Sequence, residues 1–557
     1  MDGFKIFSLK EKNMNHQAEL VLSNAVLWAL CPMKRFPGGM RIVDGKIMQI
    51  YNRASMPQLP MADLGGMHII PGLIDAHQHF FVSALLPLYG DAGAWRSKAD
   101  ALAAIEAACR PGGTDKRWVM FSGLNNAIWK NPALPGLAEI DAIAASTPVL
   151  VIDTSLHHGL FSSAALIRAG INRQSLKFPT DVDLTFAGRL KGAIWEDAMG
   201  RMIFAMYREV IHNYSTEERR KLILDAAERC LRKGLTHVHD PGVPSDVQRL
   251  LKDAQPYTPL KLSWSVTGYE GLFSPLALKD DLEALNSPHA PKSAKFFLDG
   301  AARTASSMPV IAGLKTALKA AKNSVLQGNA APLRQLFEQK IILKNGELTL
   351  PYQRYPDTDE LINWAGMFAD KGYRLVMHAL GNVAACQAAQ AVQNLGMGGG
   401  SSIEHVTLMH PGGLDTFAGC GAVASLQPGF IPFYAETIER MGAIPPYLKV
   451  IPLRSLMDRG VSVCISSDGP CASDDPLHNI RRAVDRKRMD GTMFDPGEAI
   501  SEIEALTAGT IGGSRSLGLK NDGLVEGAAA TFCVVDGDPF SDNSRVVQTW
   551  IDGKRAF

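Results

Sequence analysis

The stretch HIIPGLIDAHQHFF, residues 68–81, indicates how the whole chain folds. Its first half is almost continuously apolar, which is typical of a buried strand in a parallel sheet. Strand side chains alternate faces, so His77 and His79 lie on the same face, about 6–7 Å apart along the strand. Two imidazoles so placed can bind one metal ion. The stretch LTHVHD places His237 and His239 at the same spacing, so the pair alone does not locate a metal.

Seven more β-type runs follow this one, separated by helical patterns. The eight runs are HIIPGLIDAHQH at 68–79, LTHVHD at 235–240, LKLSWSV at 260–266, AKFFLDG at 294–300, RLVMHAL at 374–380, SSIEHV at 401–406, AVASLQP at 422–428 and VSVCISSD at 461–468. Alternating strands and helices are the signature of a parallel sheet with crossover helices. Eight such units predict the fold class α/β, with a TIM-type (β/α)8 barrel as the main domain.

The two ends of the chain have a different pattern. Residues 18–66 and residues 516–557 both contain short β-runs joined by Asp-Gly turns. Turns of this kind are typical of hairpins, and neither segment fits a strand–helix unit. We therefore predict that the two segments form one small β-sandwich domain, and that the barrel spans residues 67–515.

Two segments inside the barrel region also depart from the repeat. Residues 98–196 add the strands RWVMFSG and PVLVIDTSLHHG, which predicts an inserted α/β subdomain near the barrel mouth. Ala302 to Tyr352 form a second, less regular insertion. A chain of 557 residues exceeds the roughly 250–300 residues of a single core, so one large domain with additions, or two domains, is expected.

Composition excludes several classes of function. The 57 Lys and Arg balance 56 Asp and Glu, and no basic run accumulates, so nucleic acid is not an expected partner. No stretch reaches the ~18 apolar residues that span a bilayer, and the first residues lack the apolar region of a signal peptide. We therefore expect no membrane association. The eight cysteines lack paired spacing, which favours reduced thiols and a cytoplasmic location.

Metal-competent side chains end four other predicted strands. They are Lys295 in AKFFLDG, His378 in RLVMHAL, His405 in SSIEHV and Asp468 in VSVCISSD. Barrel active sites lie at the carboxyl ends of the strands, so side chains from distant parts of the chain converge there. Together with the first histidine pair, these residues predict a centre for one or two divalent ions. Zinc is the expected ion, with manganese, iron and cobalt as alternatives.

The motifs PGLIDxHxH, K-F-x-x-D-G, H-A-x-G, I-E-H and S-S-D-x-P resemble those of the amidohydrolase superfamily. They are most similar to its amidohydrolase-3 branch, which includes N-substituted formamide deformylase-like and YtcJ-like proteins. The resemblance covers nearly the whole chain. It implies that His77 and His79 bind the more buried metal, and that His378 and His405 bind the second.

The resemblance implies two further roles at this centre. Lys295 becomes carboxylated by carbon dioxide and bridges both ions, and Asp468 binds metal and acts as the general base. Independently, a divalent ion lowers the pKa of bound water toward about 7, and a nearby carboxylate can pass the proton to a leaving nitrogen. The alternative is a mononuclear site in which Lys295 remains a free amine paired with Asp299 or Asp468.

Three residues are expected to contact substrate: His157, Asn126 and Glu196. His157 falls where related proteins have a histidine before Asn-Ser, although Ser-Ser follows here. Glu196 matches a frequent acidic position of the branch, and also fits a capping or ion-pair role. Asn126 lies in GLNNAI, where the branch usually reads G-x-G-W-D.

Other departures concern the barrel itself. Asn382 in HALGN replaces the usual aspartate, so the pocket is expected to differ from that of characterised relatives. His237 and His239 have no ligand counterpart in the branch. A role in core packing or in supporting the ligands is therefore expected for both.

The expected activity is hydrolysis of a C–N bond in a small-molecule amide, N-formyl amine, urea or cyclic amide. Deamination, ester hydrolysis and a non-catalytic metal- or ligand-binding barrel are the alternatives. Deaminase relatives usually carry a glutamate three residues after the strand-five histidine, where this chain has Gly381. Retention of Lys295 and Asp468 argues against a site that has lost catalysis. A small molecule is the expected partner, and a homodimer is an open alternative to a monomer.

Overall fold

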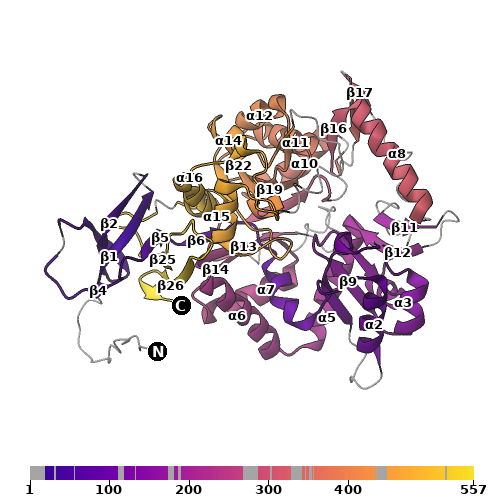
Figure 1. The fold of residues 1–557 in the computed structure, drawn as a ribbon, viewed down its shortest axis with the longest axis horizontal. Coiled ribbons are helices and arrows are strands. Elements are labelled where there is room, and N and C mark those ends of the chain that lie inside the picture. The colour runs from indigo at the N-terminus through magenta and orange to yellow at the C-terminus, as the bar shows by residue number, and fades with distance from the viewer. Residues whose placement is uncertain are drawn as a thin grey trace.

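The computed structural model describes most of the chain. The described residues are 19–557 apart from 31–32, 56, 111–117, 132, 173–180, 186–189, 268–286, 302–303, 328–341, 345, 351–353, 356, 433–434, 436–447 and 521–522. The barrel occupies the middle of Figure 1. A sheet that combines strands β1 to β5, within residues 19–71, with strands β25 to β27, within residues 532–555, lies at the left of that view, and a second α/β unit lies at the right.

Eight parallel strands form the central sheet, in the spatial order β6, β13, β14, β15, β19, β20, β22 and β24. Their bounds are β6 Leu73–Asp75, β13 Leu235–Val243, β14 Lys261–Val266, β15 Ser293–Phe297, β19 Arg374–Ala379, β20 Ser402–His405, β22 Val423–Leu426 and β24 Val463–Ile465. Each strand overlaps one of the eight predicted runs, and spatial order follows chain order, so the prediction of a parallel barrel is confirmed.

Main-chain hydrogen bonds join the first and last barrel strands just beyond their ends. The N–H of Asp468 donates to the carbonyl of His77 at 2.7 Å, and the N–H of His79 donates to the carbonyl of Gly469 at 2.8 Å. These bonds close the barrel at its carboxyl end. They also fix three predicted metal ligands relative to one another.

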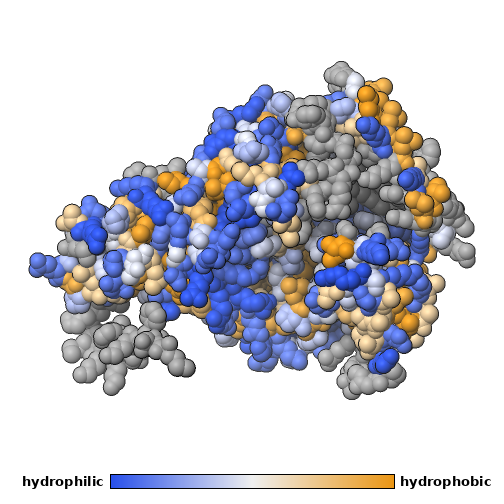
Figure 2. All heavy atoms as spheres, in the orientation of Figure 1, coloured by the Kyte–Doolittle hydropathy of each residue, from blue (hydrophilic) through white to orange (hydrophobic). Residues whose placement is uncertain are grey.

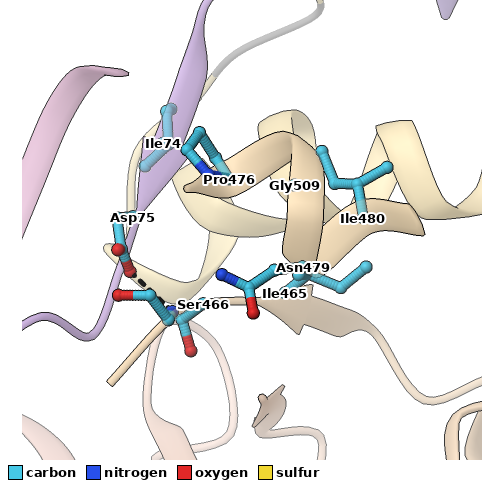
Figure 3. Close-up of a pocket in the computed structure, with 9 residues that line it drawn as sticks. Ile74, Asp75, Ile465, Ser466, Pro476, Asn479, Ile480 and Gly509 are labelled. Atoms are coloured by element: carbon cyan, nitrogen blue, oxygen red, sulfur yellow. Dashed lines mark hydrogen bonds between the residues drawn. The ribbon is translucent and has the colours of Figure 1, made fainter. Parts of the chain in front are cut away.

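Asp75, the last residue of β6, reinforces this closure. Its Oδ1 accepts the backbone N–H of Ser467 at 3.0 Å and that of His77 at 3.3 Å. Figure 3 shows Asp75 at the wall of a small cavity that Ser466 and Asn479 also line. Burial raises the pKa of Asp75 to about 6, although its bonds to Ser467 act in the opposite direction. The carboxylate therefore bridges the first and last strands.

Helices cover the outside of the barrel. They include α1 Phe80–Leu85, α6 Thr216–Arg232, α7 Ser245–Ala254, α10 Thr358–Ala369, α11 Asn382–Asn394, α12 Pro411–Ala418, α14 Leu453–Met457, α15 Pro476–Asp485 and α16 Glu502–Thr507. Helix α6 shows why these segments are helical. Ser215 accepts the backbone N–H of Glu218, and the Glu218 carboxylate accepts the N–H of Ser215, which forms a capping box. Its buried residues recur at helical spacing, from Ile223 to Leu231.

Both ends of the chain contribute to one flanking sheet. Its strands are β1 Glu19–Leu30, β2 Met33–Val43, β3 Lys46–Asn52, β4 Ala62–Asp63, β5 His68–Pro71, β25 Phe532–Asp536, β26 Arg545–Ile551 and β27 Lys554–Arg555. Strand β5 pairs in parallel with β1 and antiparallel with β25, which joins the two ends. Buried side chains from both ends, such as Leu27 and Phe532, share one apolar cluster. That this unit is a β-sandwich stays a prediction.

A second sheet lies between the first two barrel strands in sequence. Its strands are β7 Gly90–Asp91, β8 Val119–Leu124, β9 Val149–Asp153, β10 His158–Phe161, β11 Val182–Leu184 and β12 Leu190–Trp195, with helices α2 Lys98–Cys109, α3 Leu137–Ala144 and α4 Ser163–Ala169. It has an apolar cluster of its own that includes Trp95, Ile140 and Leu160. The 18-residue helix α5, Glu196–Asn213, follows directly and packs into the main core. We call the segment from β7 to β12 the inserted subdomain.

A smaller addition follows β15. Strands β16 Ser306–Pro309, β17 Ile342–Lys344 and β18 Glu347–Leu350 form a three-stranded sheet, and helix α8, Val310–Gln327, begins directly after β16. Ile311, Leu314 and Leu318 of α8 are exposed. Figure 2 shows hydrophobic side chains along this helix at the upper right. No helix in the described part of the chain combines the length and the apolar composition needed to cross a membrane.

The lower interior of the barrel contains a buried chain of histidines and serines. Ser263 Oγ lies 2.8 Å from His237 Nε2 and 2.8 Å from His239 Nδ1. His239 Nε2 lies 2.9 Å from Ser265 Oγ, which in turn lies 2.8 Å from Ser293 Oγ. Burial lowers the pKa of His237 to about 3 and that of His239 well below its usual value. Both imidazoles are therefore neutral core groups engaged by hydroxyls.

These neutral imidazoles predict that the protein loses stability in acid. The unfolded imidazole takes up a proton below about pH 6.5, whereas folded His237 does so only near pH 3. The free energy of unfolding should therefore fall as pH drops below 6.5, by about 2 kcal/mol per imidazole between pH 7 and pH 5. Urea unfolding at both pH values should show a smaller pH dependence for His237→Gln than for the wild type. An equal pH dependence in both proteins would contradict a neutral His237.

Candidate metal centre

The predicted ligands meet at the carboxyl end of the barrel. His77 and His79 follow β6, and Asp468 follows β24. The ligand atoms of these three residues all lie within 4.8 Å of one another. Asp468 Oδ1 is 3.4 Å from His77 Nε2 and 3.3 Å from His79 Nε2. The structure thus brings together ligands from the first and last barrel strands.

The histidines from the middle strands join this cluster. The ring centroid of His405, at the end of β20, lies 4.8 Å from that of His77 and 4.5 Å from that of His378 on β19. Lys295 on β15 points into the same interior, because its charge acts on both His77 and His378. Six side chains from five strands or strand ends therefore share one small volume.

Four buried polar atoms of this cluster have no hydrogen-bond partner. They are His77 Nε2, Lys295 Nζ, His378 Nε2 and Asp468 Oδ1. Such atoms cost about 1–3 kcal/mol each when buried unpaired, and native proteins rarely retain them. Imidazole nitrogens and carboxylate oxygens are the ligands that divalent metals such as zinc accept. The donor set therefore fits a divalent metal.

Two buried polar residues contact Nδ1 of predicted ligand rings and so orient these rings. Glu404 is fully buried, with Oε2 2.6 Å from His77 Nδ1, and its other oxygen accepts the Ser402 hydroxyl. Gln427 Oε1 lies 2.9 Å from His405 Nδ1. These contacts occupy Nδ1 and leave Nε2 of each ring for a metal. The sequence alone predicts neither role, although Glu404 stands inside the I-E-H motif.

The electrostatics of the centre favour the neutral form of two predicted ligand rings and the ionised form of two carboxylates beside them. Burial lowers the pKa of His405 to about 3 and that of His378 well below its usual value, so both rings are neutral. Burial raises the pKa of Glu404, but the adjacent His77 more than offsets this and brings it to about 2. Burial also raises the pKa of Asp468, yet its contacts with the two nearby histidines hold it well below the usual value.

Lys295 is buried beside the ring of Phe297, with Nζ 4.9 Å from the ring centroid. Burial lowers its pKa to about 8, against the opposing charge of Glu404. Asp299 Oδ1 accepts the N–H of Leu380, and its Oδ2 accepts those of Gly381 and Ala305. Asp299 is therefore committed to the backbone, and Nζ makes no hydrogen bond to it.

Strained backbone accompanies the ligands. His405 has φ of 76° and Asp468 has φ of 56°, a region that residues with a side chain rarely adopt. Strain of this kind persists where the surrounding structure enforces it, and it clusters at functional sites. His405 is the last residue of β20 and Asp468 lies three residues after β24, so the strain falls where these side chains turn toward the centre.

The three predicted substrate contacts lie in or next to the inserted subdomain. His157 Nδ1 is 2.6 Å from Glu196 Oε2, and the His157 ring centroid is 5.5 Å from that of His378. The structure thus places this pair beside the metal ligands. Asn126 begins the 3-10 helix η2, Asn126–Ile128, after strand β8, and is half-buried. Its contact with substrate stays a prediction.

Comparison with known proteins places the chain among metal-dependent hydrolases. The family model described as "Amidohydrolase family" matches residues 61–557. N-substituted formamide deformylase of Arthrobacter pascens is 25% identical over 542 residues, covering 93% of each chain. Putative amidohydrolase YtcJ of Bacillus subtilis (strain 168) is 25% identical over 530 residues, covering 89% of each chain. The crystal structure of an uncharacterized metal-dependent hydrolase from Pyrococcus horikoshii OT3 shares the fold, with a TM-score of 0.64 at 20% identity, over 94% of this chain and 98% of that one.

The contact between Glu404 and His77 generates a prediction about metal affinity. Glu404→Gln should weaken metal binding about 10–100-fold, because carboxylates that orient a ligand histidine contribute this much. Competition with a chelator, followed by elemental analysis, measures the change. Glu498→Gln is the matched control, since Glu498 is also buried but bonds Ser455. Unchanged metal affinity in Glu404→Gln would contradict the proposal that Glu404 orients His77.

Proposed function

Since the chain belongs to the amidohydrolase family and is a metal-dependent hydrolase of C–N bonds, we propose that its substrate is a small-molecule amide, N-formyl amine, urea or cyclic amide. The observation that carries this proposal is the convergence of buried, unpartnered donor atoms from His77, Lys295, His378 and Asp468. The relative named N-substituted formamide deformylase makes N-formyl amines the first compounds to test.

We assign His77 and His79 to one ion and His378 and His405 to a second, with zinc as the expected metal. The neutral rings of His378 and His405, and the contacts that Glu404 and Gln427 make with His77 and His405, support this assignment. A bound divalent ion lowers the pKa of its water to about 7 and polarises the scissile carbonyl. The protein's part is to hold the ligand nitrogens in place and to keep the surrounding interior dry.

Lys295 is proposed to carry carbon dioxide as a carbamate. Its Nζ is buried and without a hydrogen-bond partner, and its lowered pKa makes the neutral amine accessible near neutral pH. The amine nitrogen attacks the carbon of carbon dioxide and loses one proton, which leaves an anionic oxygen donor on the side chain. Such a donor would bridge two ions, whereas a free ammonium would repel them.

Asp468 is proposed as the general base. Its carboxylate is ionised, because its contacts with His77 and His79 hold its pKa well below the usual value. It takes a proton from the attacking water and donates it to the leaving nitrogen. His157 and Asn126 are proposed to contact the substrate from the side of the inserted subdomain, and Glu196 is proposed to hold His157 for this contact.

Two of the alternative functions are disfavoured by residues of the centre. Deamination is disfavoured because Gly381 stands where deaminase relatives usually carry a glutamate. A non-catalytic barrel is disfavoured because both Lys295 and Asp468 reach the centre. A cytoplasmic location, a homodimer and the absence of nucleic-acid and membrane partners remain predictions from the sequence.

A substrate panel tests the proposed function. Protein prepared with zinc or manganese should contain one or two ions per chain by elemental analysis. It should hydrolyse at least one N-formyl amine, amide, urea or lactam faster than the matching ester or aminopurine. Preferential turnover of the ester or the aminopurine would favour the alternative reactions, and bound metal without any turnover would favour the binding barrel.

Asp468→Asn should reduce turnover about 10²–10⁴-fold, because asparagine keeps the shape of aspartate but cannot accept the proton. The fold should persist, and much of the metal should remain. Steady-state kinetics and elemental analysis measure both effects. Asp415→Asn is the control, since Asp415 is an exposed partner of Arg459. Near-normal activity of Asp468→Asn would exclude the general-base role.

Lys295→Ala should lose activity together with the second ion. A short carboxylic acid in the buffer should partly restore both, because it replaces the bridging carbamate oxygens. Lys371→Ala, at an exposed position, is the control. Full activity of Lys295→Ala without added acid would contradict the carbamate.

A further inference from the structure

The inserted subdomain delivers one imidazole to the metal centre. His157 lies in the turn between β9 and β10, and its ring lies 5.5 Å from that of His378. The same turn is attached to the loop that carries Asp468, because the Cys471 thiol donates to the Ser155 carbonyl at 3.4 Å. His157 therefore approaches the metal ligands from outside the barrel.

Two contacts hold His157 against Glu196. The backbone N–H of Glu196 donates to the carbonyl of His157 at 2.7 Å, and the Glu196 carboxylate lies 2.6 Å from His157 Nδ1. Glu196 is fully buried at the first residue of α5, whose body packs into the main core. The imidazole is thus fixed at both its backbone and its ring.

The turn itself is built to hold this position. Asp153 Oδ1 accepts the backbone N–H groups of Ser155 and His158, and Ser155 Oγ accepts that of His157. Leu156 has φ of 60° and Glu196 has φ of 46°, so strained residues stand on both sides of the contact. Strain at two such positions indicates that the placement of the imidazole is enforced.

The barrel makes room for this arrangement. A side chain at Gly300, in the loop after β15, would come within 2.3 Å of the Glu196 carboxylate. Only glycine fits there without displacing Glu196. The loop after the strand that carries Lys295 is therefore shaped to receive a carboxylate from the edge of the inserted subdomain.

Exposure locates the open side of the centre. The side chains of His77 and His378 are 1% and 3% exposed, whereas those of His79 and His157 are 23% and 14% exposed. A small molecule that reaches the ligands from solvent therefore meets the side where His157 lies. With Nδ1 taken by Glu196, Nε2 is the remaining polar atom of the ring.

We propose that His157 is a substrate-binding residue whose Nε2 hydrogen-bonds the amide group that contains the scissile C–N bond. Glu196 is a positioning residue that holds the His157 ring for this contact. The inference rests on the proposed function, since it assumes that an amide occupies the centre. It assigns substrate recognition to the inserted subdomain and leaves metal binding to the barrel.

Binding of a small hydroxamate tests this without turnover. Acetohydroxamate offers the carbonyl oxygen and the N–H of an amide, and its affinity for the zinc-loaded full-length protein can be measured by calorimetry. His157→Asn should keep its metal and bind acetohydroxamate about three- to tenfold more weakly, the effect of one neutral hydrogen bond. His212→Asn, at the far end of α5, is the control and should bind as the wild type does.

The role of Glu196 is tested by a double-mutant cycle. Glu196→Gln should weaken hydroxamate binding in the same direction, and the double variant should lose no more than His157→Asn alone, because Glu196 acts through His157. A purely structural Glu196 would give additive losses and would overturn the positioning role. If Glu196→Gln does not fold, Glu196→Asp replaces it in the cycle.

Three outcomes bear directly on His157. Wild-type hydroxamate affinity in His157→Asn would overturn the proposal. Loss of metal in His157→Asn would also overturn it, because the residue would then be a ligand. If the wild type binds acetohydroxamate through His157 but hydrolyses no amide in the panel, the proposed function fails while the binding role stands.

Discussion

The burial of polar atoms inside the barrel is the constraint on which the rest of the structure depends. Each such atom needs a partner, because an unpaired one costs about 1–3 kcal/mol. In the lower interior, serine hydroxyls satisfy His237 and His239. In the upper interior, Glu404 and Gln427 each satisfy one nitrogen of a ligand ring. The nitrogens that remain there are the ones a divalent ion would satisfy, so one physical rule separates core histidines from ligand histidines.

The same region also completes the fold. The bonds between Asp468 and His77, and between His79 and Gly469, connect chain segments almost 400 residues apart in sequence. The ligands therefore reach one another only when the barrel is closed. An ion that binds this arrangement and not the unfolded chain stabilises the closed barrel by mass action. Folding and metal binding would thus be coupled through the first and last strands.

The barrel strands and the side chains at their carboxyl ends could be predicted, because each apolar run ends in a polar residue that is visible locally. The residues that hold the ligand rings in place could not be predicted from the sequence. Glu404 reaches His77 across 327 residues, and Gln427 reaches His405 from the neighbouring strand end, so both contacts depend on the spatial placement of strands. Asp75 belongs to the same class, since its partner Ser467 lies 392 residues away. The strain at Glu196 is likewise set by its surroundings and leaves no local pattern.

The proposed metal ligands come from the barrel, and the proposed substrate contacts come from the inserted subdomain. This difference explains why the motifs identify a family but not a substrate. Every proposed metal ligand comes from the barrel, where register and burial leave little freedom. His157 and Asn126 come from a segment that has its own sheet and its own apolar cluster. That segment supplies no proposed metal ligand, so its sequence can vary more than that of the ligand-bearing strand ends, as grafted sites on conserved scaffolds commonly do. The departure at GLNNAI falls in this segment, so the substrate of this chain is expected to differ from those of its relatives where the insertion faces the centre.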